Sequence, residues 1–170
     1  MKPAHALIFA MPLFVLACQR QAQPPPTSSP GTPPTVRPTA AAPAPVKAPD
    51  ALASRNTDAD GVVADVMEFR RKGNTLTAVI RLRSQASTTS VITNDYDHVY
   101  VMDEAGAKKY VVLKDEKDGY IASWIRYAGL TPGGTLTYWV KFPAPPRELR
   151  SATLVGSSAT PFEDLPIQDQ

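Results

Sequence analysis

Reactive side chains are scarce in this chain of 170 residues. It contains one cysteine, Cys18, and His98 is the one histidine beyond residue 17. A single cysteine forms no internal disulfide, so a folded domain here must be stabilised by its hydrophobic core. A site built on two histidines is excluded after residue 17, and no GxSxG, HExxH, Walker or GxGxxG motif occurs. The sequence therefore predicts no cofactor and indicates no particular reaction.

An excess of positive charge is also lacking in most of the chain. Residues 1–50 contain four basic residues and one acidic residue, whereas residues 51–170 contain fourteen basic and fifteen acidic residues. Domains that bind nucleic acid usually carry a strong basic patch. The net charge of −1 after residue 50 therefore argues against a nucleic-acid partner.

No apolar run is long enough to span a bilayer. Lys2 precedes an uncharged apolar stretch from Ala6 to Ala17. Twelve helical residues reach roughly 18 Å, well short of the ~30 Å hydrocarbon core. A basic start followed by a short apolar stretch is typical of a secretory signal peptide, which we predict over residues 1–17.

The end of this leader, Val15-Leu16-Ala17-Cys18, resembles the lipobox of bacterial lipoproteins. The resemblance implies that Cys18 becomes the first residue of the mature protein and the site of lipidation. The chain would then belong to the bacterial cell envelope and be held on a membrane through its lipid anchor. Gln19 resembles the default residue for sorting to the outer membrane, facing the periplasm, where the source has two membranes. The alternatives are an ordinary cleaved leader and an uncleaved anchor.

A proline-rich tract follows the cysteine. Ten of the eighteen prolines lie between Pro24 and Pro49, and large apolar residues are few there. Such a composition cannot bury enough apolar surface to offset the entropy of ordering, so the tract should remain disordered. In polyproline II, at ~3.1 Å per residue, thirty residues span up to roughly 100 Å. We predict a linker over residues 18–54 and one folded domain over residues 55–170.

The folded part has a hydrophobic period of two, which is typical of half-buried strands. Alternation is clearest over residues 75–84, and residues 61–70 form the other half of a hairpin that turns at Gly73. Gly119 is expected to supply a positive φ in the turn 115–119. Seven or so short strands and frequent turns predict an all-β fold, an antiparallel sandwich. The further strands are expected at residues 99–102, 110–114, 120–124, 135–142 and 152–155.

Residues 130–154, LTPGGTLTYWVKFPAPPRELRSATL, resemble the late strands of immunoglobulin-like domains in bacterial lipoproteins. In those domains a Leu-x-Pro-Gly turn leads into a strand that ends in Phe, followed by prolines and a final strand. The resemblance implies an immunoglobulin-like β-sandwich with a tethered binding or accessory role. It carries over no catalytic residues.

A calcium site is suggested at the start of the folded part. Asn56, Asp58, Asp60 and Gly61 match positions 1, 3, 5 and 6 of an EF-hand loop. Position 12, which requires a bidentate carboxylate, is Met67. The pattern therefore favours an acidic turn that leads into a strand, and Asp58 and Asp60 stay weak candidates for a metal site.

A binding surface is the stronger candidate. Alternation over residues 135–142 places Trp139 and Lys141 opposite the apolar face of that strand. An exposed tryptophan beside a lysine suits stacking on a sugar ring or anchoring of a protein partner. The alternative is a tryptophan in a partly covered outer sheet with no binding role. Arg81 and Arg83 would add basic groups if the strand register brings them close, and the alternative is a solvated edge whose charges prevent aggregation.

These patterns predict an envelope lipoprotein whose β-sandwich is a noncatalytic binding or accessory module, with an envelope protein or glycan as partner. Two alternatives come from other classes. One is a metal-binding sensor domain built on Asp58 and Asp60. The other is a small envelope enzyme that uses His98 with its acidic neighbours Asp95 and Asp97.

Overall fold

The structure is a computed structural model that describes residues 44–123 and 125–170. The chain divides into two units, residues 1–40 and 41–170, and all strands of the described residues lie in the second. The predicted signal peptide, Cys18 and most of the proline-rich tract lie outside the described residues. Within the described ranges, no helix has both the length and the apolar character needed to cross a bilayer.

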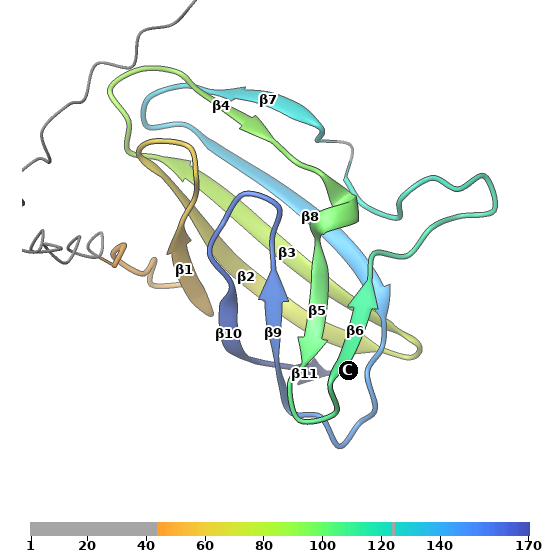
Figure 1. The fold of residues 1–170 in the computed structure, drawn as a ribbon. Coiled ribbons are helices and arrows are strands. Elements are labelled where there is room, and N and C mark those ends of the chain that lie inside the picture. The colour runs from red at the N-terminus through yellow and green to blue at the C-terminus, as the bar shows by residue number, and fades with distance from the viewer. Residues whose placement is uncertain (1–43, 124) are drawn as a thin grey trace, which may run out of the picture. The chain divides into compact units, whose positions relative to one another are not determined.

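Two antiparallel sheets enclose the core (Figure 1). The first sheet has the order β1-β2-β3-β8, and a short parallel strand, β11, is added to β2. The second sheet has the order β10-β9-β5-β6. A separate two-stranded sheet pairs β4 with β7, and one 3₁₀ turn, Tyr96–His98, precedes β5. The strands are Ala53–Asn56 (β1), Val62–Lys72 (β2), Thr75–Ser84 (β3), Ser90–Thr93 (β4), Tyr100–Asp103 (β5), Lys108–Val111 (β6), Tyr127–Leu130 (β7), Thr135–Pro143 (β8), Ser151–Val155 (β9), Phe162–Pro166 (β10) and Gln168–Asp169 (β11).

The strand order is immunoglobulin-like. β3 pairs with β8 and β5 pairs with β9, so each sheet joins strands that are distant in the sequence. In the immunoglobulin fold, strands A, B and E are neighbours in one sheet and strands C, F and G in the other. β2, β3 and β8 take the places of A, B and E, while β5, β9 and β10 take those of C, F and G. The predicted antiparallel β-sandwich is confirmed.

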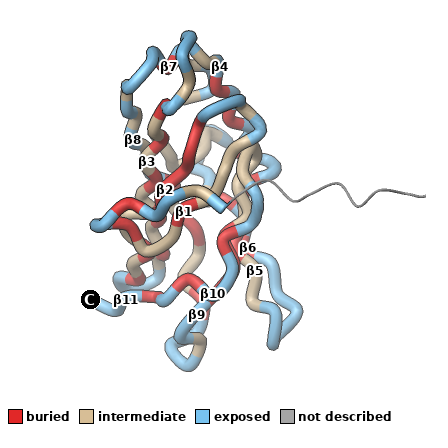
Figure 2. The backbone as a smooth tube through the Cα atoms, turned by 90° about the vertical axis from the view of Figure 1, so that its left-hand side faces the viewer, coloured by how far each residue is buried: buried red, intermediate tan, exposed pale blue. Residues whose placement is uncertain are grey.

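Alternation along the strands builds the core. In β3, residues 76, 78, 80 and 82 are buried, and in β8 the side chains of Val140 and Phe142 are fully buried. The second sheet adds Val101, Leu154 and Phe162 to the same cluster. Figure 2 shows the buried residues along the strands and the exposed ones mainly in the loops. Apolar packing between the sheets stabilises the domain, as expected for a fold without a disulfide.

A β-bulge at Met67 changes which side of β2 faces the core. The pairing with β3 shifts between Val66 and Glu68, so the extra residue reverses the alternation. Val66 and Phe69 are consequently both fully buried, although three positions separate them. Glu68 and Arg70 lie on the outer side of the sheet, where they form a 2.9 Å ion pair.

The predicted domain boundary at residue 55 is wrong. β1 begins at Ala53, and Ala48, Ala51 and Ser54 are buried. The amide of Leu52 donates to the carbonyl of Val66, which ties this segment to β2. Alanines and prolines gave no periodic signal, so the sequence pattern did not show that residues 44–52 belong to the fold. We call residues 44–52 the N-terminal segment.

Several local expectations also need correction. Residues 120–123 form isolated bridges at Tyr120 and Ala122 instead of a strand. The positive φ in the turn 115–119 belongs to Asp118, at 62°, and not to Gly119. In this turn the Asp115 side chain accepts hydrogen bonds from the amides of Lys117 and Gly119. The short strands β1, β4, β7, β10 and β11 were not predicted.

Candidate binding face

The outer face of the first sheet gathers the four residues of the predicted binding surface. Arg81 and Arg83 lie on β3, and Trp139 and Lys141 lie on the neighbouring strand β8. The register places Arg81 opposite Thr137 and Trp139 opposite Val79, so the arginine and the tryptophan are diagonal neighbours. We call this surface the outer face; it comprises Thr77, Val79, Arg81 and Arg83 of β3 and Thr135, Thr137, Trp139 and Lys141 of β8.

Trp139 is the large aromatic side chain of this face, with 39 % of its surface exposed. The Lys141 ammonium lies 5.5 Å from the centre of its ring, within the range of a cation–π contact. The hydroxyl of Ser123 accepts from the Trp139 amide, which fixes the backbone at this point. The indole therefore lies on the outer side of the sheet with a cation over its ring, and its exposed part is available for stacking with a ligand ring.

The arginine end of the face contains a buried carboxylate. Asp65 of β2 is fully buried and accepts hydrogen bonds from Arg83, Arg81 and Ser54. The Ser54 hydroxyl lies 2.6 Å from its Oδ1, and Nη2 of Arg83 lies 3.0 Å from the same oxygen. Burial would raise the pKa of Asp65, but the hydrogen bonds from Arg83 and Ser54 and the two arginine charges outweigh it, so that pKa is lowered. Asp65 is therefore ionised at neutral pH.

The N-terminal segment lies over this end of the face. Val46 accepts from Arg83 through its carbonyl, at 3.2 Å, and the Ala48 amide donates to Ser54. Asp50 binds Arg81 with both oxygens, at 2.8 and 2.9 Å. That hydrogen-bonded pairing lowers the pKa of Asp50. An open hollow of about 420 Å³ remains between the segment and the sheet, lined by Val46, Lys47, Ala48, Pro49, Asp50, Arg81, Arg83 and Thr135.

The basic residues of the β2–β3 hairpin do not join this cluster. Arg70 pairs with Thr77 in the register, four positions along β3 from Arg81. Arg71 points inward, is 3 % exposed, and binds Asp169 and the carbonyls of the loop that follows β8. One basic residue of the hairpin therefore anchors the C-terminal strand instead of facing a ligand.

His98 lies at the surface, away from the outer face. Its Nδ1 is 2.9 Å from Oδ2 of Asp95, and the side chain is 75 % exposed. Asp97 instead accepts from the Tyr120 hydroxyl. Among the described residues, Asp95 is the hydrogen-bond partner found for the His98 ring. The arrangement is an exposed histidine–carboxylate pair at a 3₁₀ turn.

Asp58 and Asp60 lie in the turn between β1 and β2, where Gly61 adopts a φ of +67°. The Asp58 amide donates to the carbonyl of Ser158, and the Ser90 hydroxyl donates to the carbonyl of Asp60. Within residues 44–123 and 125–170, no group of three acidic, histidine or cysteine side chains is placed to hold a metal ion. The turn leads the chain from β1 into β2.

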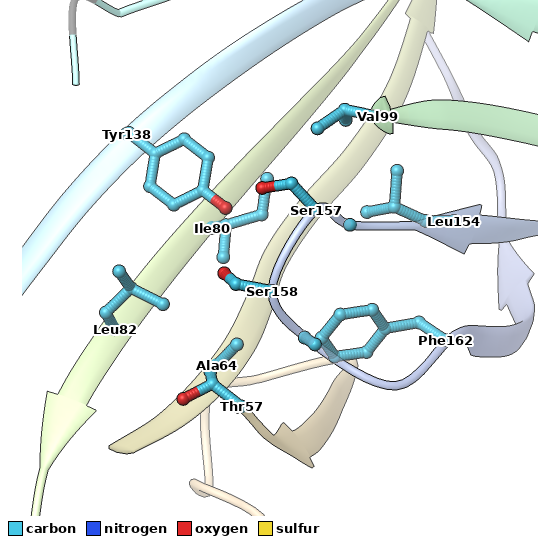
Figure 3. Close-up of a pocket in the computed structure, with 12 residues that line it drawn as sticks. Thr57, Ala64, Ile80, Leu82, Val99, Tyr138, Leu154, Ser157, Ser158 and Phe162 are labelled. Carbon is cyan, nitrogen blue, oxygen red and sulfur yellow. The ribbon is translucent and has the colours of Figure 1, made fainter. Parts of the chain in front are cut away.

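A recess between the two sheets is lined by apolar side chains and a few hydroxyls (Figure 3). The hydroxyls of Tyr138, Ser157 and Ser158 lie around the same space. Burial raises the pKa of Tyr138, the nearby Tyr96 adds to that effect, and a hydrogen bond with Asn94 opposes it. The recess measures about 10 Å³, which is room for about one water molecule. It is too small to hold an organic ligand.

Sequence reasoning missed Asp65 and Asp50, which organise the arginine end of the outer face. Asp65 stands in the apolar run GVVADVMEF, between Ala64 and Val66. A lone carboxylate inside an apolar strand pattern is a signal for a buried ion pair, because an unpaired charge there is costly. Asp50 gave no such signal, because it follows the proline-rich tract.

Comparisons of this chain with known protein families, with curated proteins and with solved structures find no match.

Proposed function

We propose that this chain is an envelope lipoprotein, anchored through Cys18, whose β-sandwich is a noncatalytic module that binds an envelope glycan on its outer face. In this proposal the proline-rich tract is a spacer between the lipid and the domain. In a bacterium with two membranes, the module works from the outer membrane, facing the periplasm. The observation that carries the binding part is that one face of the first sheet carries Trp139, Lys141, Arg81 and Arg83.

The chemistry of this face supports a sugar ligand. Trp139 offers an apolar ring on which the C–H face of a sugar can stack, and Lys141 beside it donates hydrogen bonds. Thr77 and Thr137 add hydroxyls on the neighbouring positions of β3 and β8. A flat aromatic platform with polar groups around it matches the alternation of apolar and hydroxyl groups on a glycan.

The anchor is tested by labelling cells with radioactive palmitate. The wild-type protein should incorporate label, and Cys18→Ser should remove it, because Cys18 is the one thiol in the chain. Label that persists in Cys18→Ser would refute the lipid anchor. Fractionation of the same cells then locates the protein in the inner or outer membrane.

The binding face is tested by co-sedimentation of the purified protein with insoluble envelope polysaccharide. Trp139→Ala should reduce the bound fraction at least tenfold, since it removes the stacking platform. Tyr127→Ala is the matched control, because Tyr127 is 74 % exposed but lies on the separate β4–β7 sheet. An equal loss in both variants, or no loss in Trp139→Ala, would overturn this assignment; capture of a protein instead of polysaccharide would replace the glycan by a protein partner.

A further inference from the structure

We propose that the arginine end of the outer face is an anion site for the carboxylate of an acidic sugar, and that Asp50 occupies this site when no ligand is bound. The inference rests on the proposed glycan-binding face and names the class of sugar. Asp50 acts as an internal competitor, so the N-terminal segment sets the affinity of the site.

The contact between Asp50 and Arg81 has the geometry of a bound carboxylate. Nη1 and Nη2 of Arg81 each donate to a different oxygen of Asp50, at 2.9 and 2.8 Å. This bidentate fork is the arrangement by which arginine recognises carboxylates in general. The Asp50 side chain is 59 % exposed, so it can turn away and be replaced by a ligand carboxylate while its neighbours Ala48 and Ala51 stay buried.

Asp65 holds the arginines in place independently of Asp50. Arg83 binds both oxygens of the buried Asp65, and Arg81 reaches Oδ2 of Asp65 at 3.4 Å. Asp65 therefore keeps the Arg81 guanidinium oriented after the Asp50 side chain leaves.

The surroundings of the hollow favour an anion. Lys47, Arg81 and Arg83 line it or border it, against the two carboxylates of Asp50 and Asp65. When the Asp50 side chain alone turns out of the hollow, these three cations face the one remaining carboxylate, Asp65. The volume of about 420 Å³ falls within the range of ordinary ligand sites.

The register connects this anion site to the aromatic platform. Diagonal neighbours on adjacent antiparallel strands are about 7–8 Å apart, and Arg81 and Trp139 are such a pair. That spacing suits one sugar ring stacked on Trp139 with a carboxylate on the same or the next residue reaching Arg81. A uronic acid polymer carries a carboxylate on each ring and fits this pattern, whereas a neutral glycan would leave Arg81 with Asp50.

The purified full-length protein is titrated with a galacturonic acid oligomer and with its methyl ester, which has the same rings without charge. The wild-type protein should bind the acid at least tenfold more tightly than the ester. Asp50→Asn should bind the acid about three- to fivefold more tightly than wild type, because an exposed ion pair is a weak competitor. Its affinity for the ester should not change.

Glu116→Gln is the matched control for charge, since Glu116 is exposed on the distant turn 115–119. It should leave both affinities unchanged. An equal gain in Glu116→Gln and Asp50→Asn, or equal binding of acid and ester, would overturn the anion site.

Arg81→Gln should weaken binding of the acid at least tenfold and binding of the ester by much less. Arg81→Lys keeps the charge near Asp65 but cannot donate two hydrogen bonds to one carboxylate in the way a guanidinium does. It should weaken binding of the acid severalfold. This variant serves as the test if Arg81→Gln does not fold. Unchanged acid binding in a folded Arg81 variant would overturn the inference. Trp139→Ala separates the glycan-binding face from the anion site. If Trp139→Ala loses binding of both acid and ester while the Arg81 and Asp50 variants have no effect, the anion site is refuted and the glycan-binding face is still supported. Acid binding that needs Arg81 but not Trp139 would refute the proposed face.

Discussion

Replacement of Asp65 by asparagine removes the negative charge that holds Arg81 and Arg83 on the outer side of β2. The side chain keeps its size, and its amide can still bond to Ser54, but its NH₂ group faces arginine donors instead of accepting from them. A hydrogen bond to a charged group contributes roughly 1.5–3 kcal/mol, and breaking a fully buried pair costs about 3–5 kcal/mol. Side chains of Arg81 and Arg83 are 22 % and 23 % exposed, so water replaces part of the loss.

The expected cost of Asp65→Asn is therefore about 2–3 kcal/mol in the free energy of unfolding at pH 7. For a domain of this size that corresponds to a fall of roughly 10 °C in Tm. Urea denaturation followed by circular dichroism measures the cost, and Glu116→Gln, which removes a charge from an exposed turn, should change it by less than about 0.5 kcal/mol.

The pH dependence gives the stricter test of the same argument. The pKa of Asp65 is lower in the folded protein than in the unfolded chain, so its stabilising effect is present above about pH 4 and is lost as pH falls through the folded pKa. The difference between wild type and Asp65→Asn should stay constant from pH 8 to 5 and shrink below pH 4. A cost below about 0.5 kcal/mol at pH 7, or a cost that does not change in acid, would refute the role given to this carboxylate.

Three further predictions test other parts of the fold. Gly61→Ala places a Cβ 2.8 Å from the backbone nitrogen of Ala86 at a φ of +67°, so it should lower the free energy of unfolding by about 2 kcal/mol or more. Gly73→Ala, at a φ of +56° with open space around the new Cβ, should lower it by about 1 kcal/mol. Equal losses of the two variants in urea denaturation would refute the close approach at Gly61. Arg71→Lys keeps the charge but loses the paired hydrogen bonds from the guanidinium to Asp169 and to the loop carbonyls. Thermal unfolding should show a loss of about 2 kcal/mol in the free energy of unfolding. An unchanged Tm would contradict the role of Arg71 as an anchor for the C-terminal strand. Phe142→Ala leaves a cavity at a fully buried position and should lower the free energy of unfolding by about 3–5 kcal/mol in thermal unfolding. A loss of less than about 1 kcal/mol would mean that Phe142 does not contribute to the packing between the two sheets.

The regular part of the fold was predictable because alternation reports burial directly. Residues 75–84 and 135–142 alternate in the sequence, and they form the two central strands β3 and β8 of the first sheet. The same alternation placed Trp139 and Lys141 on the outside. The residues of the outer face that lie on regular strands could therefore be predicted from the sequence.

The remaining features depend on contacts that local patterns do not encode. The strands β4 and β7 have four residues each and pair across more than thirty intervening residues, so neither gives a period of its own. The bulge at Met67 reverses a pattern within one strand. The N-terminal segment is ordered by Asp50, Val46 and Ala48 meeting β1 and β3, and its composition alone indicates a linker.

The central claim is that ligand binds on the outer face, and chemical-shift mapping tests it most directly. Amide resonances of isotopically labelled protein are followed while soluble fragments of envelope glycan are added. We expect the largest shifts on β3 and β8, at Val79, Arg81, Thr137 and Trp139 and their neighbours, with little change on β5, β6 or the β4–β7 sheet. Shifts that cluster around the 3₁₀ turn Tyr96–His98 or on the β4–β7 sheet, with β3 and β8 unchanged, would contradict the account.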